Sequence, residues 1–429
     1  MTPVTCWDVV VAGAGPAGSI AALVLARSGA RVALVDKAAF PRDKACGDLI
    51  GPRGVRLLEE LAVAVPDAGT GADLLVAGPS RRRARLPAFG GKTYADHGMV
   101  VPRRILDDCL RAAAIAAGAT PVRARISAAD LASGGSVTAL ITSDGGRLES
   151  DIVIGADGAL SKVAQLAGML DPDNALWGFA IRGYIPAQVP LPLLMLLDAQ
   201  PWRIYPGYGW LFPGADGRAN VGIGVGMGRR RTPALLRPDL DRLCAILRRE
   251  GDISPDAQPG PIVGGWLRMG GTGTPPAAGN VLLVGDAAGL INPLQGEGIA
   301  PGMVSARAAA EAVTAGPARA ACVYTEVIGE LMRPYMTGAA ALQEAMLARP
   351  RLASAAMRML TTPPLRRLVA GTWSLYWNGL ADGAAPRPSA RSAALVQTLA
   401  WRLANRPERH GRGGTLQSVQ AVQTRRSPE

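Results

Sequence analysis

A run of glycines directly after a short apolar strand constrains the fold of this chain more than any other feature. Residues 8–12 are rich in β-branched side chains and predict a buried strand. The loop at 13–18, Gly-Ala-Gly-Pro-Ala-Gly, follows at once, and an Ala- and Leu-rich helix is expected from about 17 to 28. A second strand, 31–35, ends at Asp36. Strand, glycine loop, helix, strand and acid in this order predict the dinucleotide-binding unit of a parallel sheet.

Each glycine of this loop is required for a different steric reason. Gly13 permits the tight turn, Gly15 lets the backbone approach a pyrophosphate, and Gly18 lets the helix pack closely on the sheet. Asp36 is placed to accept hydrogen bonds from a ribose hydroxyl. The candidate cofactor residues of this unit are Gly13, Gly15, Pro16, Ala17, Gly18, Asp36 and Lys37.

Two later segments also combine a buried strand with a glycine turn and one acidic residue. Residues 151–161 run from a strand into an Asp-Gly pair, and residues 281–289 run from a strand into a Gly-Asp pair. The second acid is placed to reach a ribityl hydroxyl, and the helix N-terminus after it favours an anion. These pairs add four candidate cofactor residues, namely Asp157, Gly158, Gly285 and Asp286.

Together these segments resemble the flavoprotein family that is built like p-hydroxybenzoate hydroxylase. The dinucleotide glycines, the Asp-Gly pair and the Gly-Asp pair occur in that family's order, and Arg103 matches its arginine at the start of a helix beside the flavin. The resemblance implies FAD as a tightly bound cofactor. The sequence contains no second nucleotide fingerprint, so NAD(P)H would bind transiently or another external donor would supply the electrons.

Within this group the chain is similar to the geranylgeranyl reductase family, most of all to bacterial members that saturate an isoprene unit of menaquinone. The family similarity rests on residues 40–48, 206–224 and 292–299, and the similarity to the bacterial members rests on residues 178–184 and the Pro-Gly-Tyr-Gly-Trp block. It extends over roughly residues 5 to 310. Leu49 stands where glycine is common, and Gln295 where a smaller polar residue is usual. Ala45 and Ala164 also depart from the pattern. The resemblance places further residues beside the flavin, namely Cys46, Gly47, Pro293, Gly296, Gly298 and Ile299.

Three aromatic residues carry the most specific part of this similarity. Tyr208, Trp210 and Phe212 alternate along a predicted strand and therefore share one face. We expect them to form the wall of a substrate tunnel, with Gly222 and Gly224 on the following strand. The alternative interpretation is a sheet face packed on the core.

Reduction of an isolated alkene needs a proton as well as a hydride, since no carbonyl group polarises the double bond. Cys46 follows Lys44 in a loop and is the candidate acid, with an unreactive buried thiol as the alternative. Backbone amides of residues 293–298 are available to a flavin that develops negative charge. Glu297 belongs to that loop and is a candidate tether for it.

Composition excludes several other classes of protein. The net charge is +12, but only four of the basic residues are lysines, and the arginine clusters lack the interleaved aromatic residues of a nucleic-acid surface. We therefore predict no nucleic-acid partner. Five scattered cysteines without a C-x-x-C motif, and two histidines, predict neither a disulfide framework nor a metal site. A reducing cytoplasm is the expected location.

The predicted fold class is α/β, with a Rossmann-like FAD-binding domain, an inserted antiparallel substrate sheet and a C-terminal helical region. The FAD-binding domain is expected to comprise residues 1–74, 98–165 and 266–330, and the substrate-binding domain residues 75–97 and 166–265. The C-terminal helical region is expected at 331–404, and a disordered tail at 405–429.

The C-terminal region is basic and carries aromatic residues between about 350 and 380. Such a segment suits peripheral contact with the inner face of the cell membrane, although packing on the protein itself is the commoner use of an amphipathic helix. No run of residues reaches the roughly 20 apolar residues of a membrane span.

The predicted function is an FAD-dependent reductase that saturates a C=C bond of an isoprenoid lipid. A monooxygenase that acts on an aromatic or terpenoid substrate is the enzymatic alternative, since the same fold can form a flavin hydroperoxide. The chain lacks the Trp-x-Trp-x-Ile-Pro block, which argues against a flavin halogenase. A flavin-bound electron carrier is the non-enzymatic alternative.

Overall fold

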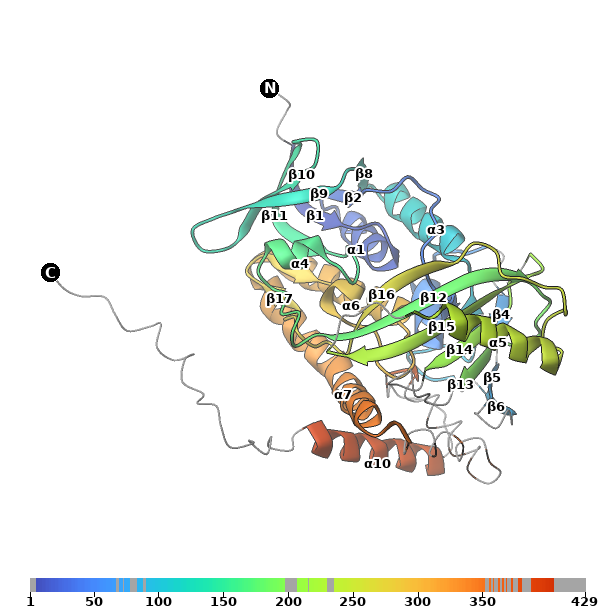
Figure 1. Cartoon of the computed structure of the whole chain (residues 1–429). Helices are drawn as coiled ribbons and strands as arrows, with labels where there is room; N and C mark the ends of the chain where they lie inside the picture. The colour runs from blue at the N-terminus through green and yellow to red at the C-terminus, as the bar shows by residue number, and fades with distance from the viewer. Residues whose placement is uncertain are drawn as a thin grey trace.

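The described part of the chain forms two large sheets, one small sheet and a group of helices (Figure 1). The computed structural model describes residues 5–66, 69–71, 73–77, 83–87, 90–196, 207–214, 216–229, 235–351, 377–379 and 387–404, together with residues 355, 358, 362, 365, 368 and 372.

The first sheet is built around the strand that precedes the glycine loop. β1 (Thr5–Ala12) pairs in parallel with β2 (Val32–Asp36) on one side and with β11 (Arg147–Gly155) on the other. The strand order is β17 (Ala277–Ala278), β18 (Val281–Leu283), β11, β1, β2 and β8 (Thr120–Arg123). In addition, β10 (Val137–Thr142) pairs with β11, and β9 (Ile126–Leu131) pairs with β10. Since β1, β11 and β18 are adjacent and parallel, the three predicted glycine turns meet at one edge.

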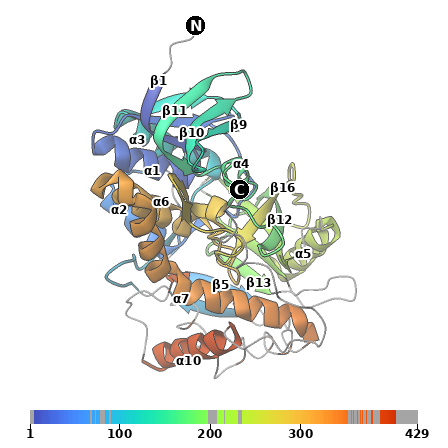
Figure 2. The same ribbon diagram turned by 90° about the vertical axis from the view of Figure 1, so that its left-hand side faces the viewer.

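Helices cover this sheet and complete its core. α1 (Pro16–Arg27) packs between α3 (Arg103–Ala116) and α6 (Ile299–Ala315), and Figure 2 shows α6 beside α2 (Pro52–Glu60). The predicted helix after the glycine loop is confirmed. α6 begins at Ile299, directly after the loop at 292–298, with Gly298 as its N-cap.

The second sheet has the order β16 (Val263–Met269), β12 (Leu176–Pro186), β15 (Arg218–Gly228), β14 (Tyr208–Phe212), β13 (Leu193–Leu196), β5 (Asp73–Ala77) and β6 (Arg83–Pro87). The prediction of a fully antiparallel sheet is wrong at one pair, since β13 and β5 run parallel. No hairpin joins these two strands, because β5 comes from a separate insertion, so their direction is free. β5 also starts at Asp73, before the predicted boundary at 75, and the domain boundaries remain a proposal.

Smaller elements join the two lobes. β3 (Leu49–Ile50), β7 (Gly98–Val100) and β4 (Gly69–Gly71) form the small sheet. Two further helices are α4 (Lys162–Leu166) and the longer α5 (Arg237–Glu250). The 3₁₀ turns are η1 (Gly285–Ala288) and η2 (Pro317–Arg319). Buried residues of α5 and β15, among them Leu243 and Val221, form the core on one face of the second sheet. The opposite face of that sheet carries the three predicted aromatic residues.

At the C-terminal end, α7 (Ala320–Ala348) lies beside α10 (Arg387–Ala404), as Figures 1 and 2 show. Most of the basic segment at 350–380, including Trp373 and Tyr376, and the predicted tail at 405–429 lie outside the described residues. Among the helices that the structure describes, none is both long enough and apolar enough to span a bilayer.

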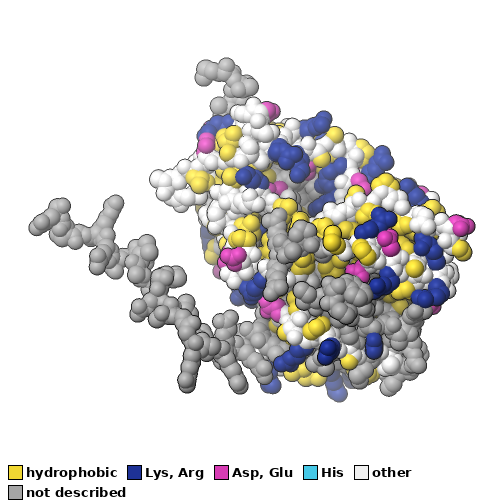
Figure 3. Space-filling model, in the orientation of Figure 1, with side chains coloured by type: hydrophobic (Ala, Val, Ile, Leu, Met, Phe, Trp, Pro, Cys, Tyr) yellow, Lys and Arg dark blue, Asp and Glu magenta, His cyan; other side chains and the backbone are white. Residues whose placement is uncertain are grey.

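Basic side chains are spread over the surface. On the face shown in Figure 3, lysine and arginine side chains lie among hydrophobic and acidic ones. Several arginines form ion pairs, such as Arg83 with Asp252 at 2.5 Å and Arg307 with Glu60 at 2.6 Å. Part of the positive charge is therefore locally compensated.

Candidate active site

A cavity of about 490 Å³, here called the main cavity, lies at the sheet edge where β1, β11 and β18 end. Residues of β12 and β16 from the second sheet, among them Ala180 and Gly265, form its other side. Thirteen of the predicted cofactor residues line it, namely Gly15, Pro16, Ala17, Lys37, Cys46, Arg103, Asp157, Gly158, Gly285, Asp286, Gly296, Gly298 and Ile299. The sequence therefore located this cavity from segments that are far apart in the chain.

The other predicted cofactor residues do not line the main cavity. A Cβ atom on Gly18 would clash with the carbonyl oxygen of Gly13, so this pair sets how closely α1 approaches the loop. The carboxylate of Asp36 accepts hydrogen bonds from the backbone N–H groups of Ala14, at 2.9 Å, and Ala38, at 2.8 Å. These three predicted residues shape and hold the glycine loop.

The residues around Gly15 fit an anionic pyrophosphate. Gly15 is the N-cap of α1 and has no capping side chain, so the first amides of the helix are available to a ligand. A Cβ atom at this position would lie 3.5 Å from Nη2 of Arg42 and 3.8 Å from Nη2 of Arg103. Both guanidinium groups also pair with Asp107, at 3.0 Å and 2.7 Å. A branched side chain at residue 15 would fill the space between the helix N-terminus and two cations.

A smaller cavity of about 80 Å³, here called the side pocket, adjoins the main cavity. Tyr208, Trp210 and Gly296 line both spaces. The remaining residues that line the side pocket are Gly47, Leu49, Leu74, Leu194, Phe212, Gln295, Glu297 and Trp377. Most of these side chains are apolar, and they come from the second sheet, the small sheet and its preceding loop, the 292–298 loop and the C-terminal region.

The three predicted aromatic residues share one strand face and line the side pocket. Tyr208, Trp210 and Phe212 lie on one face of β14 in a shared apolar cluster, and the Trp210 and Phe212 rings stack with centroids 6.3 Å apart. Gly222 and Gly224 do not line either cavity. Instead, a Cβ atom on Gly222 would overlap the Trp210 indole, and one on Gly224 would lie 3.7 Å from it. The missing side chain of Gly222 lets the indole lie flat on β15.

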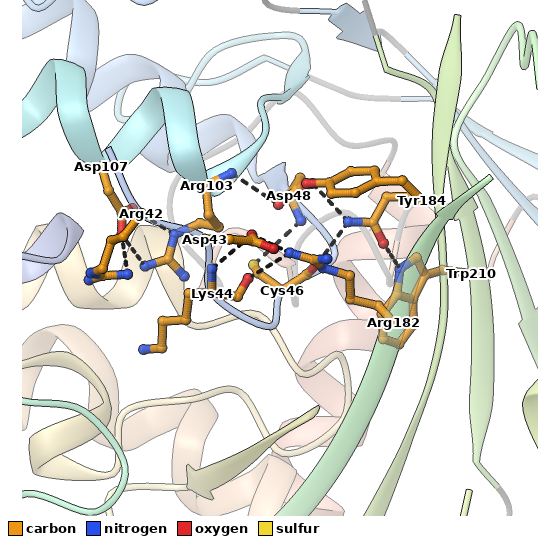
Figure 4. Close-up of polar contacts among 11 residues, drawn as sticks. Arg42, Asp43, Lys44, Cys46, Asp48, Arg103, Asp107, Arg182, Tyr184 and Trp210 are labelled. Atoms are coloured by element: carbon orange, nitrogen blue, oxygen red, sulfur yellow. Dashed lines mark hydrogen bonds and ion pairs between the residues drawn. The ribbon is translucent and has the colours of Figure 1, made fainter. Parts of the chain in front are cut away.

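The Cys46 thiol belongs to a turn that is held by buried polar groups (Figure 4). The N–H of Asp48 donates to Sγ of Cys46 at 3.4 Å, and the Asp48 carboxylate accepts from Tyr184 Oη at 2.6 Å and from Asn220 Nδ2 at 2.7 Å. Burial raises the pKa of the Cys46 thiol and also the pKa of Asp48. The thiol is therefore protonated at neutral pH, which is the form that a proton donor requires.

The loop at 292–298 lines both cavities and is tied to β14 and to the start of α2. Tyr208 Oη donates to the Gln295 carbonyl at 2.7 Å, and Gly296 has a left-handed φ of 68°, where a Cβ atom would clash with Tyr208. Glu297 accepts from the Gly51 N–H at 3.0 Å and from the Trp377 indole. Burial raises the pKa of Glu297 to about 7. Glu297 is thus the predicted tether of the loop and also faces the side pocket.

Pro293 contributes to the same loop from a position that does not line either cavity. Its carbonyl oxygen accepts a hydrogen bond from Gln343 Nε2 of α7 at 2.8 Å. Asn292 also orders the loop, because its Oδ1 accepts from the Leu294 N–H at 2.9 Å. The loop at 292–298 is therefore anchored to α7.

The acids after β11 and β18 have different partners. Asp157 accepts from Ser161 Oγ at 2.5 Å and from the Lys162 N–H at 2.6 Å, so it caps α4 while it lines the main cavity. Asp286 lies 3.8 Å from the Lys44 ammonium group, which reaches across the cavity from the loop after β2. Asp286 is therefore the more accessible of the two acids to a hydroxyl-bearing ligand.

The sequence did not identify Asp48, Tyr184 and Asn220 as site residues. All three are polar groups that face the thiol turn from β12, β15 and the loop itself. Asn220 could have been found, because it precedes Gly222 and Gly224 on the same alternating face of β15. Asp48 and Tyr184 carry no comparable signal, since their meeting depends on how the two lobes pack.

Comparisons with known proteins agree with this geometry. Residues 6–176 match the FAD binding domain family. The chain is 36% identical over 326 residues to a menaquinone reductase of Mycolicibacterium smegmatis, covering 72% of this chain and 76% of that protein. It is 33% identical over 315 residues to digeranylgeranylglycerophospholipid reductase 1 of Methanopyrus kandleri, covering 71% and 80%.

A solved structure supports the same fold. The geranylgeranyl bacteriochlorophyll reductase-like protein of Thermoplasma acidophilum superposes with a TM-score of 0.70 at 23% identity, covering 94% of this chain and 100% of that one. At 23% identity this likeness shows a shared fold only. The assignment of the chain to a family rests on the two sequence relatives above, which are 36% and 33% identical to it. The chain belongs to the geranylgeranyl reductase family of FAD-dependent oxidoreductases.

Proposed function

We propose that this protein saturates a C=C bond of a polyprenyl chain, carried by a geranylgeranyl lipid or by menaquinone. The observation that supports this substrate most is the apolar side pocket beside the main cavity, with Tyr208 and Trp210 on the boundary. A methyl-branched alkene gains free energy from burial against such a wall and needs no hydrogen-bond partner there. The names of the sequence relatives support the same substrate class.

When bound and reduced, FAD supplies a hydride to one alkene carbon and is itself oxidised. The other carbon must then receive a proton, so that the double bond gains two hydrogen atoms. We assign this proton to the Cys46 thiol, which lines the main cavity and stays protonated because it is buried. Solvent protons restore the thiol after each turnover.

We further propose how the lining residues bind FAD. The amides after Gly15 and the Arg42 and Arg103 guanidinium groups would hold the pyrophosphate, and Asp286 would accept from the ribityl chain. Backbone amides of the loop that contains Gly296 would face the isoalloxazine ring. Electrons would come from NAD(P)H or from another external donor that binds transiently, since the sequence has one dinucleotide fingerprint.

An anaerobic assay tests the proposed reaction and separates it from monooxygenation. The holoprotein is reduced with dithionite, mixed with menaquinone or a geranylgeranyl lipid without oxygen, and the lipid is analysed by mass spectrometry. We expect a product that has gained two hydrogen atoms. A lipid that stays unchanged without oxygen and gains one oxygen atom in air would identify a monooxygenase instead.

We also propose peripheral association with the inner face of the cell membrane, because the substrate is a membrane lipid and residues 350–380 are rich in arginine. Binding to vesicles that contain anionic lipid should weaken as salt rises. Equal binding to neutral and anionic vesicles at every salt concentration would contradict the electrostatic part of this proposal.

A further inference from the structure

We infer that Asn220 is a positioning residue that holds the Cys46 thiol in place by joining the turn at 46–48 to the Trp210 wall. The inference rests on the proposed function, because that function gives the thiol its task. It names a residue that lines neither cavity and that acts through Cys46.

The Asn220 side chain makes three hydrogen bonds, which use both N–H donors and the carbonyl oxygen. Nδ2 donates to the Cys46 carbonyl oxygen at 2.8 Å and to Asp48 Oδ2 at 2.7 Å, and Oδ1 accepts from Trp210 Nε1 at 2.8 Å. An indole N–H can only donate, so it fixes which end of the amide faces the wall and which faces the turn. One buried amide therefore joins the turn at 46–48 to the Trp210 side chain.

The turn needs such support because its backbone is in an unfavourable conformation. Asp48 has a φ of 66°, in the left-handed region, and its side chain is 1% exposed. Its N–H donates to Sγ of Cys46, so rotation of this backbone unit would move the hydrogen bond that orients the thiol. Asn220 bonds the residues at both ends of the turn and thereby opposes that rotation.

The location of Asn220 also favours a specific role over general packing. Asn220 is 1% exposed on β15 and lies opposite Phe212 on β14, within a face that otherwise presents glycine and aromatic residues. A buried amide costs free energy unless its polar atoms are bonded, and an apolar residue would fill this position without that cost. The polar residue is useful here because it connects the substrate wall with the thiol.

The test uses Asn220→Asp, which keeps the shape of the side chain but removes both N–H donors. Asn280→Asp is the matched control, because Asn280 Nδ2 also donates to two carbonyl oxygens, those of Val137 at 2.8 Å and Asp151 at 2.9 Å, away from both cavities. The first readout is the rate at which iodoacetamide alkylates Cys46 in the holoprotein, measured by peptide mass spectrometry. Exposed Cys322 in the same molecule is the internal reference.

We expect Asn220→Asp to change the ratio of Cys46 to Cys322 alkylation about tenfold, in line with the loss of two hydrogen bonds, and Asn280→Asp to leave it unchanged. The second readout is anaerobic single turnover with the prenyl lipid. Hydride transfer should slow about tenfold in Asn220→Asp, while FAD stays bound and the half-saturating lipid concentration changes less than about twofold.

Equal alkylation ratios and equal turnover in the two variants would overturn the inference. If Asn220→Asp does not fold, Asn220→Ser, which is smaller and uncharged, is measured in the same way with the same expectation. If the unmodified protein reduces no prenyl lipid, the proposed function fails, but the alkylation ratio still decides whether Asn220 holds the thiol.

Discussion

The Trp210 indole lies directly on Gly222, so that a Cβ atom at residue 222 would overlap the Cζ2 atom of the ring. The two residues are paired across β14 and β15. Because the glycine has no side chain, the indole can lie flat and present an aromatic surface to both cavities. This contact explains in steric terms why glycines alternate on one strand and aromatic residues on the next.

Gly222→Ala should displace the indole, because the new methyl group has no space. We expect a loss of about 1 to 3 kcal/mol in the free energy of unfolding and slower reduction of the prenyl lipid, with FAD still bound. Gly224→Ala is the matched control, since its Cβ atom would lie 3.6 Å from Ala180 and 3.7 Å from the indole, which is ordinary contact. Equal stability and kinetics in the two variants would show that the indole is not held by residue 222.

Gly15→Val should abolish FAD binding, because the branched side chain would occupy the space beside Arg42 and Arg103 that we assign to the pyrophosphate. The measurement is the flavin absorbance of the purified, folded variant. Gly134→Val serves as control, since a Cβ atom there would meet no atom of the described residues within 4 Å. Stoichiometric flavin in folded Gly15→Val would remove the basis for this placement.

Cys46→Ser should keep FAD bound while it lowers kcat, because a serine hydroxyl is a much weaker acid than a thiol. Loss of a positioned proton donor costs about 100-fold or more in rate. Half-buried Cys109→Ser on α3 is the control and should retain the unmodified rate. If single-turnover reduction by Cys46→Ser proceeds at the unmodified rate, the thiol only fills space.

Glu297 should make stability depend on pH. Burial raises its pKa from 4.5 to about 7, so the folded protein binds more protons than the unfolded chain between these values. This contribution is complete below about pH 4.5 and is lost as pH rises through about 7, on the order of 3 kcal/mol in total. Glu297→Gln should remove that slope from urea unfolding measured between pH 4.5 and 8.

The matched control for this experiment is Glu311→Gln on α6, because Glu311 is exposed and pairs with Arg307 on the same helix. The slope should persist in Glu311→Gln. An unchanged slope in Glu297→Gln would show that another group causes the pH dependence.

The sequence predicted which segments meet at the main cavity, because its signals are local. The glycine loop, the Asp-Gly pair and the Gly-Asp pair each combine strand and turn within about ten residues, and their strands then lie side by side. The aromatic wall was predicted for the same reason, since alternation along one strand fixes its face.

The polar groups behind the wall were not predicted, because they come together only when the two lobes pack. Asp48 and Tyr184 are 136 positions apart, and Asp48 and Asn220 are 172 apart. The steric role of Gly222 under the indole was missed as well, because alternation along a strand predicts which face a residue occupies but not which side chain packs against it. Trp377 joins the side pocket from a region that the family similarity does not cover.

The most direct test of the central proposal is anaerobic single turnover, followed as flavin reoxidation at increasing concentrations of prenyl lipid, for the unmodified protein and for Trp210→Ala. We expect lipid-dependent reoxidation in the unmodified protein. Trp210→Ala should raise the half-saturating concentration about tenfold, or change which isoprene unit is reduced, without altering the flavin spectrum. Flavin reoxidation that is independent of lipid would contradict the proposed substrate. Unchanged kinetics in a Trp210→Ala protein destabilised by about 3 to 5 kcal/mol would show that this wall is ordinary core, and would also contradict the proposal.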